Sequence, residues 1–266
     1  MKKLALAAAL RQPVRRKLNL RQSDLVSMWD DFIDWPARRA AEKGFFERAF
    51  EKRWITRVFD ACCGTGCDSI HLIKQGLQVT SNEVDSVFRK KARENAERNG
   101  VRLKLTAHDW RDIKLEDTSF DAVICLGNSL CYLFGHVDRI KALSEFRRLL
   151  RTRGILIIDE RNFQRIFDNK DTILADPRSY TVTHVYCGKE VIGYPTEIKN
   201  DRIVMEYLDL RNGKTAHLVL YPFKQGELRQ LLIDAGFRPE RISTFSDYEQ
   251  GVNPNADFYQ YVCVKS

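Results

Sequence analysis

The sequence contains no apolar run long enough to cross a membrane, no internal repeat and no low-complexity block. Its seven cysteines show no paired spacing, which argues against a disulfide-stabilised secreted domain and for a reducing compartment. The chain has 266 residues and is 44% hydrophobic, enough for a sizeable core. We therefore expect a soluble, cytoplasmic protein without membrane contact, built as one large domain or as a domain with an insertion.

Acidic residues are absent from the first 23 positions, which hold seven basic residues and so carry most of the net charge of +8. The rest of the chain is nearly neutral, which argues against a nucleic-acid partner for the folded body. The basic residues of this tail are Lys2, Lys3, Arg11, Arg15, Arg16, Lys17 and Arg21.

Residues 1–10 resemble a secretory signal, but their apolar run is short and Arg11 ends it. An arginine-rich start without acids also fits an organelle transit peptide. A third interpretation is a mobile or oligomer-forming arm, which would make the protein a homo-oligomer. The sequence leaves these alternatives open, and we treat residues 1–23 as a basic flexible tail.

A strand that ends at Asp60 runs into a turn of small residues, and a helix follows from about Asp68. Gly64 and Gly66 allow backbone angles and close approaches that a side chain would block. A second strand, residues 77–82, leads to Glu83, close to the offset of roughly 20 residues at which a carboxylate meets ribose hydroxyls. The pattern predicts a site for a nucleoside-type cofactor.

Further apolar strands are predicted at 102–107, 120–126 and 155–159, with helices between them at about 87–99 and 137–151. Uniformly apolar strands that alternate with helices indicate a parallel sheet covered on both faces. We therefore predict an α/β fold with a Rossmann-like, doubly wound, mostly parallel sheet. Polar residues follow each strand, at the edge where such sheets bind ligands.

The rest of the chain is divided around this core. Residues 24–56 are predicted to form a helical lid, in which Ser23 caps the first helix, and residues 57–163 the cofactor-binding core. Residues 164–222 hold short β-rich segments with turns at Asn200-Asp201 and Asn212-Gly213, which predicts an antiparallel insertion. Residues 223–266 complete the core with a helix and a final strand.

The turn does not suit a dinucleotide, because Cys62 and Ser69 stand where that motif has glycines. We therefore expect no binding of NAD. Instead, Asp60-x-x-Cys-Gly-Thr-Gly, an acid after the second strand and Asp109-Trp110 after the third resemble the class I S-adenosylmethionine-dependent methyltransferases.

Residues 61–81, 120–129 and 155–163 resemble more narrowly the glycine N-methyltransferase family, including its microbial glycine/sarcosine relatives. The resemblance extends from about Trp29 to the C-terminus. It implies S-adenosylmethionine-dependent N-methylation of a small amino acid, glycine, sarcosine or both, without a metal.

The resemblance also implies a cofactor site. Glu83 would hold the ribose hydroxyls, Asp109 and Trp110 would border the adenine, and Arg39 would meet the cofactor carboxylate. The complete set of implied cofactor-binding residues is Trp29, Arg39, Asp60, Cys62, Gly64, Gly66, Glu83, Asp109, Trp110, Leu126 and Ser129.

Four further residues match substrate-binding positions of the family: Asn128, Arg161, Tyr186 and Tyr207. The chain departs from the family at Leu220, which replaces a tyrosine, and it has no tyrosine near residue 20. No general base is predicted.

Each of these residues also has a purely structural interpretation. Arg161 ends a buried strand and suits one bidentate carboxylate, but it could instead pair with Asp159 or Glu160. Asn128 could be an ordinary turn residue. Glu83 and Asp109 could cap helices or lie in solvated loops. The two tyrosines could pack between strands. The cysteines at 62, 63 and 67 are better explained by packing around the turn than by a zinc site.

Two other functions remain open. The chain could methylate another small amine or a nucleic-acid base, although base-amine methyltransferases usually carry Asn/Asp-Pro-Pro-aromatic where this chain has Leu126-Gly-Asn-Ser. It could also bind S-adenosylmethionine without turnover.

Overall fold

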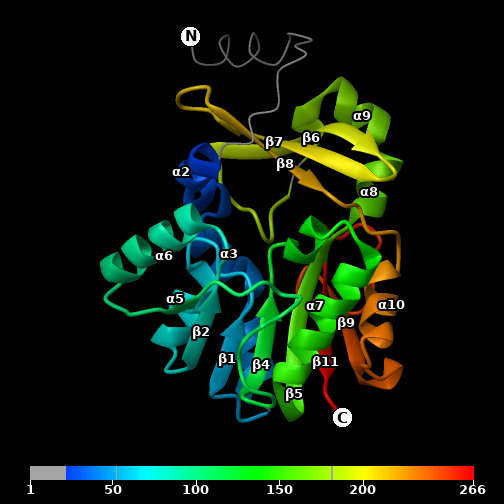
Figure 1. The fold of residues 1–266 in the computed structure, drawn as a ribbon. Coiled ribbons are helices and arrows are strands. Elements are labelled where there is room, and N and C mark those ends of the chain that lie inside the picture. Colours follow the sequence, from blue (N-terminus) through cyan, green and yellow to red (C-terminus); the bar gives the residue numbers. More distant parts are fainter. Residues whose placement is uncertain (1–21, 52, 181) are drawn as a thin grey trace.

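The computed structural model describes residues 22–51, 53–180 and 182–266 (Figure 1). The predictions for the basic tail, namely an oligomer-forming arm or a targeting segment, therefore concern residues almost entirely outside the described part and stay predictions. In the part of the chain that the structure describes, no helix combines the length and the apolar character needed to cross a membrane.

The main sheet has the strand order β10-β9-β11-β5-β4-β1-β2-β3. Strands β1 to β5 pair in parallel, whereas β11 pairs antiparallel with both β5 and β9. The predicted doubly wound, mostly parallel sheet is thereby confirmed. The bounds are β1 Arg57–Asp60, β2 Gln78–Asn82, β3 Lys104–Thr106, β4 Phe120–Cys125, β5 Leu150–Arg161, β9 Ile242–Ser246, β10 Glu249–Gln250 and β11 Phe258–Val264.

The order of the strands reverses between β1 and β4. From β1 the chain moves outward to β2 and β3, then returns to the other side of β1 with β4 and β5. All six residues of β4 are buried, which is why five of them are apolar without alternation; the sixth is Asp121. A crevice at the carboxyl ends of β1 and β4 is the expected ligand site of such a sheet.

Helices α2, α3 and α4 precede β1, in the place of the predicted lid. The Asp34 carboxylate caps α3 by accepting a hydrogen bond from the Ala37 N–H at 3.1 Å. Ser23 does not cap α2, since that helix already includes Gln22. The helix bounds are α2 Gln22–Ile33, α3 Trp35–Glu42, α4 Phe45–Glu51, α5 Cys67–Lys74, α6 Ser86–Arg98, α7 His136–Leu149, α8 Phe163–Asp168, α9 Lys170–Ala175 and α10 Glu227–Asp234.

A separate antiparallel sheet of β6 Val191–Lys199, β7 Arg202–Asp209 and β8 Thr215–Leu220 lies beyond the carboxyl ends of the parallel strands (Figure 1). It confirms the predicted β excursion and both of its turns. The segment before β6 packs on α2, because Cys187 and Gly188 donate backbone hydrogen bonds to the carbonyls of Ile33 and Phe32.

Gly188 is the closest point of this contact. A Cβ atom at Gly188 would lie 1.9 Å from the carbonyl oxygen of Asp31 and 2.7 Å from that of Phe32. Because both obstacles are backbone atoms, we expect Gly188→Ala to lower the free energy of unfolding by about 2 kcal/mol or more. Equilibrium unfolding in urea measures this change.

Gly135→Ala is the matched control for that experiment. Gly135 has φ −78° and its Cβ would meet only the Asp138 side chain, at 3.1 Å. We expect a loss of no more than roughly 1 kcal/mol there. Equal losses in the two variants would contradict the tight contact between residue 188 and α2.

Candidate active site

A cavity of about 740 Å³ opens at the carboxyl ends of β1, β2 and β4, at the switch point of the sheet. Nine of the predicted site residues line it, together with residues from α2 and β8. The predicted residues in the lining are Trp29, Cys62, Gly64, Glu83, Asp109, Trp110, Leu126, Ser129 and Tyr186. Most of the predicted cofactor positions therefore meet at one cavity, and Tyr186 is the one predicted substrate position in its wall.

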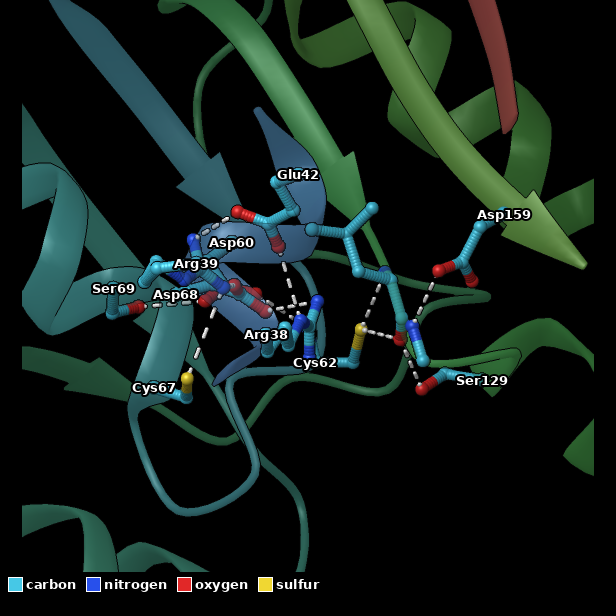
Figure 2. Close-up of polar contacts among 12 residues, drawn as sticks. Arg38, Arg39, Glu42, Asp60, Cys62, Cys67, Asp68, Ser69, Ser129 and Asp159 are labelled. Carbon is cyan, nitrogen blue, oxygen red and sulfur yellow. Dashed lines mark hydrogen bonds and ion pairs between the residues drawn. The ribbon is translucent and has the colours of Figure 1, made fainter. Parts of the chain in front are cut away.

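Asp60 and Gly66 shape the turn after β1 without lining the cavity. The Asp60 carboxylate accepts hydrogen bonds from the Ser69 hydroxyl at 2.7 Å and from the Cys62 N–H at 3.2 Å (Figure 2). Burial, followed by the nearby Asp68 carboxylate, raises the pKa of Asp60 to about 7. Gly66 precedes α5 with φ 94°, a conformation that favours glycine.

Glu83 follows β2 and directs its carboxylate across the turn. Its Oε2 accepts a hydrogen bond from the Gly64 N–H at 3.1 Å, and its Oε1 accepts one from the Asp85 N–H at 2.8 Å. Burial raises the pKa of Glu83. The carboxylate is thus held by two backbone donors at the cavity wall, and the cap of α6 is Asp85 rather than Glu83.

Trp110 and Asp109 form another part of the wall but differ in their surroundings. The indole Nε1 of Trp110 donates to the Ala61 carbonyl at 2.7 Å, which fixes the ring beside the turn. The Asp109 side chain is 51% exposed and pairs with Arg111. Hydrogen bonds from Arg111 lower the pKa of Asp109 to about 2. Asp109 is therefore a charged, solvated group at the rim.

Leu126 and Ser129 continue the cavity after β4. The Ser129 hydroxyl donates to the Leu126 carbonyl at 2.8 Å, and the Leu126 N–H lies 3.3 Å from Cys62 Sγ (Figure 2). Trp29 of α2 lies close to the turn, since a Cβ at Gly64 would lie 3.8 Å from its Nε1. These contacts support the packing interpretation of Cys62.

Of the two neighbouring arginines of α3, Arg38 lines the cavity and Arg39 does not. Arg39 pairs with Asp68 and with Glu42. Arg38 is buried and pairs with the same two acids, each at 3.1 Å (Figure 2). The predicted position thus falls one residue away from the side chain that faces the cavity.

Arg161 lies at the end of β5, 3% exposed, and it does not line the large cavity. Its guanidinium donates to the Tyr180 hydroxyl and lies 5.3 Å from the centre of the Tyr186 ring and 5.0 Å from that of Phe258. Within the described residues no carboxylate pairs with it, and its Nε has no hydrogen-bond partner.

The two acids next to Arg161 have other partners. The Asp159 carboxylate accepts the backbone N–H groups of Gly127 at 2.9 Å and Asn128 at 2.6 Å. The Glu160 carboxylate accepts the Tyr261 hydroxyl at 2.6 Å. The alternative that Arg161 forms an internal salt bridge is therefore wrong. Burial by itself lowers the pKa of Arg161, but the electrostatic influence of Tyr180, Tyr186 and Tyr207 raises it overall.

Asn128 is buried, and both polar atoms of its side-chain amide contact other residues of the protein. Its Oδ1 accepts the Arg161 N–H at 3.0 Å, while its Nδ2 lies 3.1 Å from Cys131 Sγ. With φ 62° it also occupies the left-handed conformation that turns favour. Asn128 thus fixes the loop after β4 against the end of β5.

Tyr186 connects the large cavity with Arg161. Its hydroxyl donates to the Gly127 carbonyl at 2.7 Å, and its ring stacks on Phe32 with a centroid distance of 4.4 Å. Tyr207 of β7 packs edge-on against Phe32 at 4.8 Å and is buried without lining the large cavity. Both tyrosines surround Arg161, and burial raises the pKa of each phenol.

Sequence reasoning missed Arg38, Tyr180 and the β8 residues in the cavity wall. The spacing of Arg38 and Glu42, four residues apart on one helix, could have indicated which arginine is buried. Tyr180 has no local signal, because its partner is 19 residues away in the chain.

A family profile described as methyltransferase domain matches residues 58–154. The glycine/sarcosine N-methyltransferase of Parasynechococcus marenigrum is 35% identical over 243 residues, covering 91% of this chain and 83% of the relative. That of Aphanothece halophytica is 36% identical, covering 90% and 88%. The chain belongs to the glycine/sarcosine N-methyltransferase family. This membership confirms the predicted family and the activity class, an S-adenosylmethionine-dependent N-methyltransferase.

Solved structures confirm the fold at lower identity. An S-adenosylmethionine-dependent methyltransferase from Clostridium acetobutylicum aligns with TM-score 0.66 at 15% identity, covering 90% of this chain and 97% of that one. The S-adenosylmethionine-bound amino pentose methyltransferase CalS10 from Micromonospora echinaspora aligns with TM-score 0.58 at 16% identity, covering 95% and 100%.

Proposed function

We propose that this family member transfers methyl groups to the amines of glycine and sarcosine. The observation that carries the proposal is Arg161, a buried guanidinium without a carboxylate partner among the described residues, set directly behind the cavity wall. A buried cation of this kind is costly unless a ligand pairs with it, and a planar guanidinium suits a carboxylate. The names of the relatives supply the same substrate class.

The residues of the large cavity fit S-adenosylmethionine. A cavity of about 740 Å³ is within the range for a cofactor of this size. Glu83 presents an oriented carboxylate for the ribose hydroxyls, and Trp110 offers a flat apolar face for the adenine. We assign the methionine part to Leu126 and Ser129. We assign its carboxylate to Arg38 rather than Arg39, since Arg38 lines the cavity and Arg39 does not. When bound, the cofactor supplies an electrophilic methyl group.

The protein's contribution to the reaction is to orient and desolvate the amine. Arg161 would hold the substrate carboxylate, and Tyr186 and Tyr207 would confine the amine between this point and the cofactor cavity. Burial favours the neutral amine, which has the lone pair needed for attack. We assign Asn128 to positioning, because its Oδ1 holds the main chain of Arg161.

The test is a methyl-transfer assay with purified protein. Incubation with S-adenosylmethionine and glycine is expected to give sarcosine, and incubation with sarcosine is expected to give dimethylglycine, both identified by mass spectrometry. Simple amines and nucleic acid serve as competing substrates. Binding of the cofactor without any product would support a non-catalytic protein, and methylation of simple amines as fast as glycine would contradict the role of Arg161.

A further inference from the structure

A second cavity, of about 190 Å³, is lined at the end of β5 by Glu160, Arg161 and Asn162. The Arg161 guanidinium itself lies against the rings of Tyr186 and Phe258. Side chains of a strand alternate between faces, so Glu160 points away from the chamber that Arg161 faces. On β11, Tyr259 is the direct partner of Glu160, and Tyr261 lies two residues further on the same face. Thr244 of β9 pairs with Tyr261 and completes the floor.

The roof of this cavity comes from two other segments. Phe163 and Gln164 lie at the start of α8, and Phe223 to Gly226 lead into α10, which adds Arg229. Phe163 and Phe223 are buried. The cavity is thus a partly open space between the sheet and α10, with an apolar roof, a polar floor and a rim of longer polar side chains.

Glu160 is the unusual group in this cavity. It is 5% exposed, and its Oε1 accepts the Tyr261 hydroxyl at 2.6 Å. Among the described residues, nothing donates a hydrogen bond to Oε2, and no basic side chain pairs with the carboxylate. A buried carboxyl group with an unused oxygen is costly unless a ligand or a proton satisfies it.

Positive charge stands at the rim of the same cavity. Among the described residues, the Arg229 side chain donates one hydrogen bond, to the Pro239 carbonyl at 3.2 Å. Neither Arg229 nor Lys224 forms an ion pair with a described acid. A simple cation would be attracted by Glu160 but repelled by this rim. A molecule with an ammonium group at one end and a carboxylate at the other complements both charges.

We propose that the second cavity is a binding site for a small zwitterion, whose ammonium group donates to Glu160 and whose carboxylate pairs with Arg229. Tyr259, Tyr261 and Phe223 would contact the carbon atoms between the two charges. The site adjoins the proposed substrate chamber, since Arg161 also lines it, but Glu160 and Arg161 are consecutive strand residues whose side chains leave β5 on opposite faces. It therefore goes beyond methyl transfer and does not depend on it.

The affinity of this site is expected to depend on pH. Burial, with smaller contributions from Glu227 and Asp159, raises the pKa of Glu160 to about 8. An ammonium ligand favours the ionised carboxylate, so binding releases a proton, and affinity should rise toward pH 8 by up to about tenfold per unit. The other ionisable groups that line the cavity are Arg161, Lys224, Arg229, Tyr259 and Tyr261.

Titration calorimetry on the full chain with Arg161→Ala tests the proposal, since that change removes the carboxylate receptor of the substrate chamber. The probes are glycine, β-alanine and γ-aminobutyrate, which differ in the spacing of their charges. Butylamine and butyrate each lack one charge. We expect at least one zwitterion to bind and both single-charge controls to bind at least about tenfold more weakly.

Two further variants locate the site. Glu160→Gln keeps the shape and the Tyr261 contact, and Arg229→Gln changes a half-buried rim residue, so neither is expected to disturb the fold. Each should weaken binding by about tenfold or more, and Glu160→Gln should abolish the proton release. Absence of heat for all three zwitterions, or binding unchanged by Glu160→Gln, would overturn the proposal. A failed methylation assay would leave this result untouched.

Discussion

Replacing Arg161 by alanine is expected to lower kcat/KM for glycine and sarcosine by about 100-fold or more, because two charge-assisted hydrogen bonds to the substrate carboxylate are lost. The Kd of S-adenosylmethionine should change by less than about threefold, since Arg161 does not line the cofactor cavity. Steady-state kinetics and calorimetry measure the two quantities.

Two variants control this experiment. Arg161→Lys keeps the charge but loses the planar pair of donors, so kcat/KM should still fall by about tenfold. Arg202→Ala removes an exposed arginine that pairs with Glu197 on the far turn of the second sheet, and it should behave like the parent. Parental activity of Arg161→Ala would contradict the assignment, whereas an unfolded variant, detected by circular dichroism, would leave Arg161→Lys as the decisive one.

Replacing Glu83 by alanine should weaken the binding of S-adenosylmethionine by at least about tenfold, because charge-assisted hydrogen bonds to two ribose hydroxyls disappear. The change also frees the N–H of Gly64, which Glu83 holds at 3.1 Å, and so loosens the turn. Equilibrium binding by calorimetry measures the effect.

Asp109→Ala is the contrasting variant. Asp109 lies on the same cavity, but its side chain is 51% exposed and paired with Arg111, so solvent and Arg111 already weaken its interaction with a ligand. We expect a change of less than about threefold in the Kd. If Glu83→Ala bound the cofactor as well as the parent, or if Asp109→Ala had the larger effect, the assignment of the ribose site would be wrong.

The parallel core could be predicted because its strands are unambiguous. Phe120–Cys125 is apolar apart from Asp121, since both faces of β4 are covered. The small-residue turn after Asp60 has few structural alternatives. Strand β9, Ile242–Ser246, was missed because it has only two apolar residues in five positions, three residues apart, and so lacks the alternation typical of a strand. Strand β5 also begins earlier than predicted, at Leu150, where the apolar end of α7 continues into the strand.

Most residues of the candidate site could be predicted from the sequence, but the directions of their side chains could not. Glu83 could be found from its distance to the glycine turn, because the fold fixes that spacing. The choice between Arg38 and Arg39 depends on how α3 is rotated against Asp68, which no local pattern states. Nor does a local pattern indicate the partners of Asp159, whose carboxylate accepts hydrogen bonds from two backbone N–H groups of the loop after β4. Together with the contact between Glu160 and Tyr261, this contact leaves Arg161 without an acid among the described residues.

The central claim is that the guanidinium of Arg161 receives the carboxylate of the substrate. The most direct measurement compares kcat/KM for glycine and glycinamide in the parent and in Arg161→Ala. The amide has no carboxylate, so it should be a poor substrate for the parent and lose less than about threefold in the variant, while glycine loses about 100-fold or more. Equal losses for glycine and its amide would contradict the claim, because they would show that Arg161 acts on something other than the carboxylate.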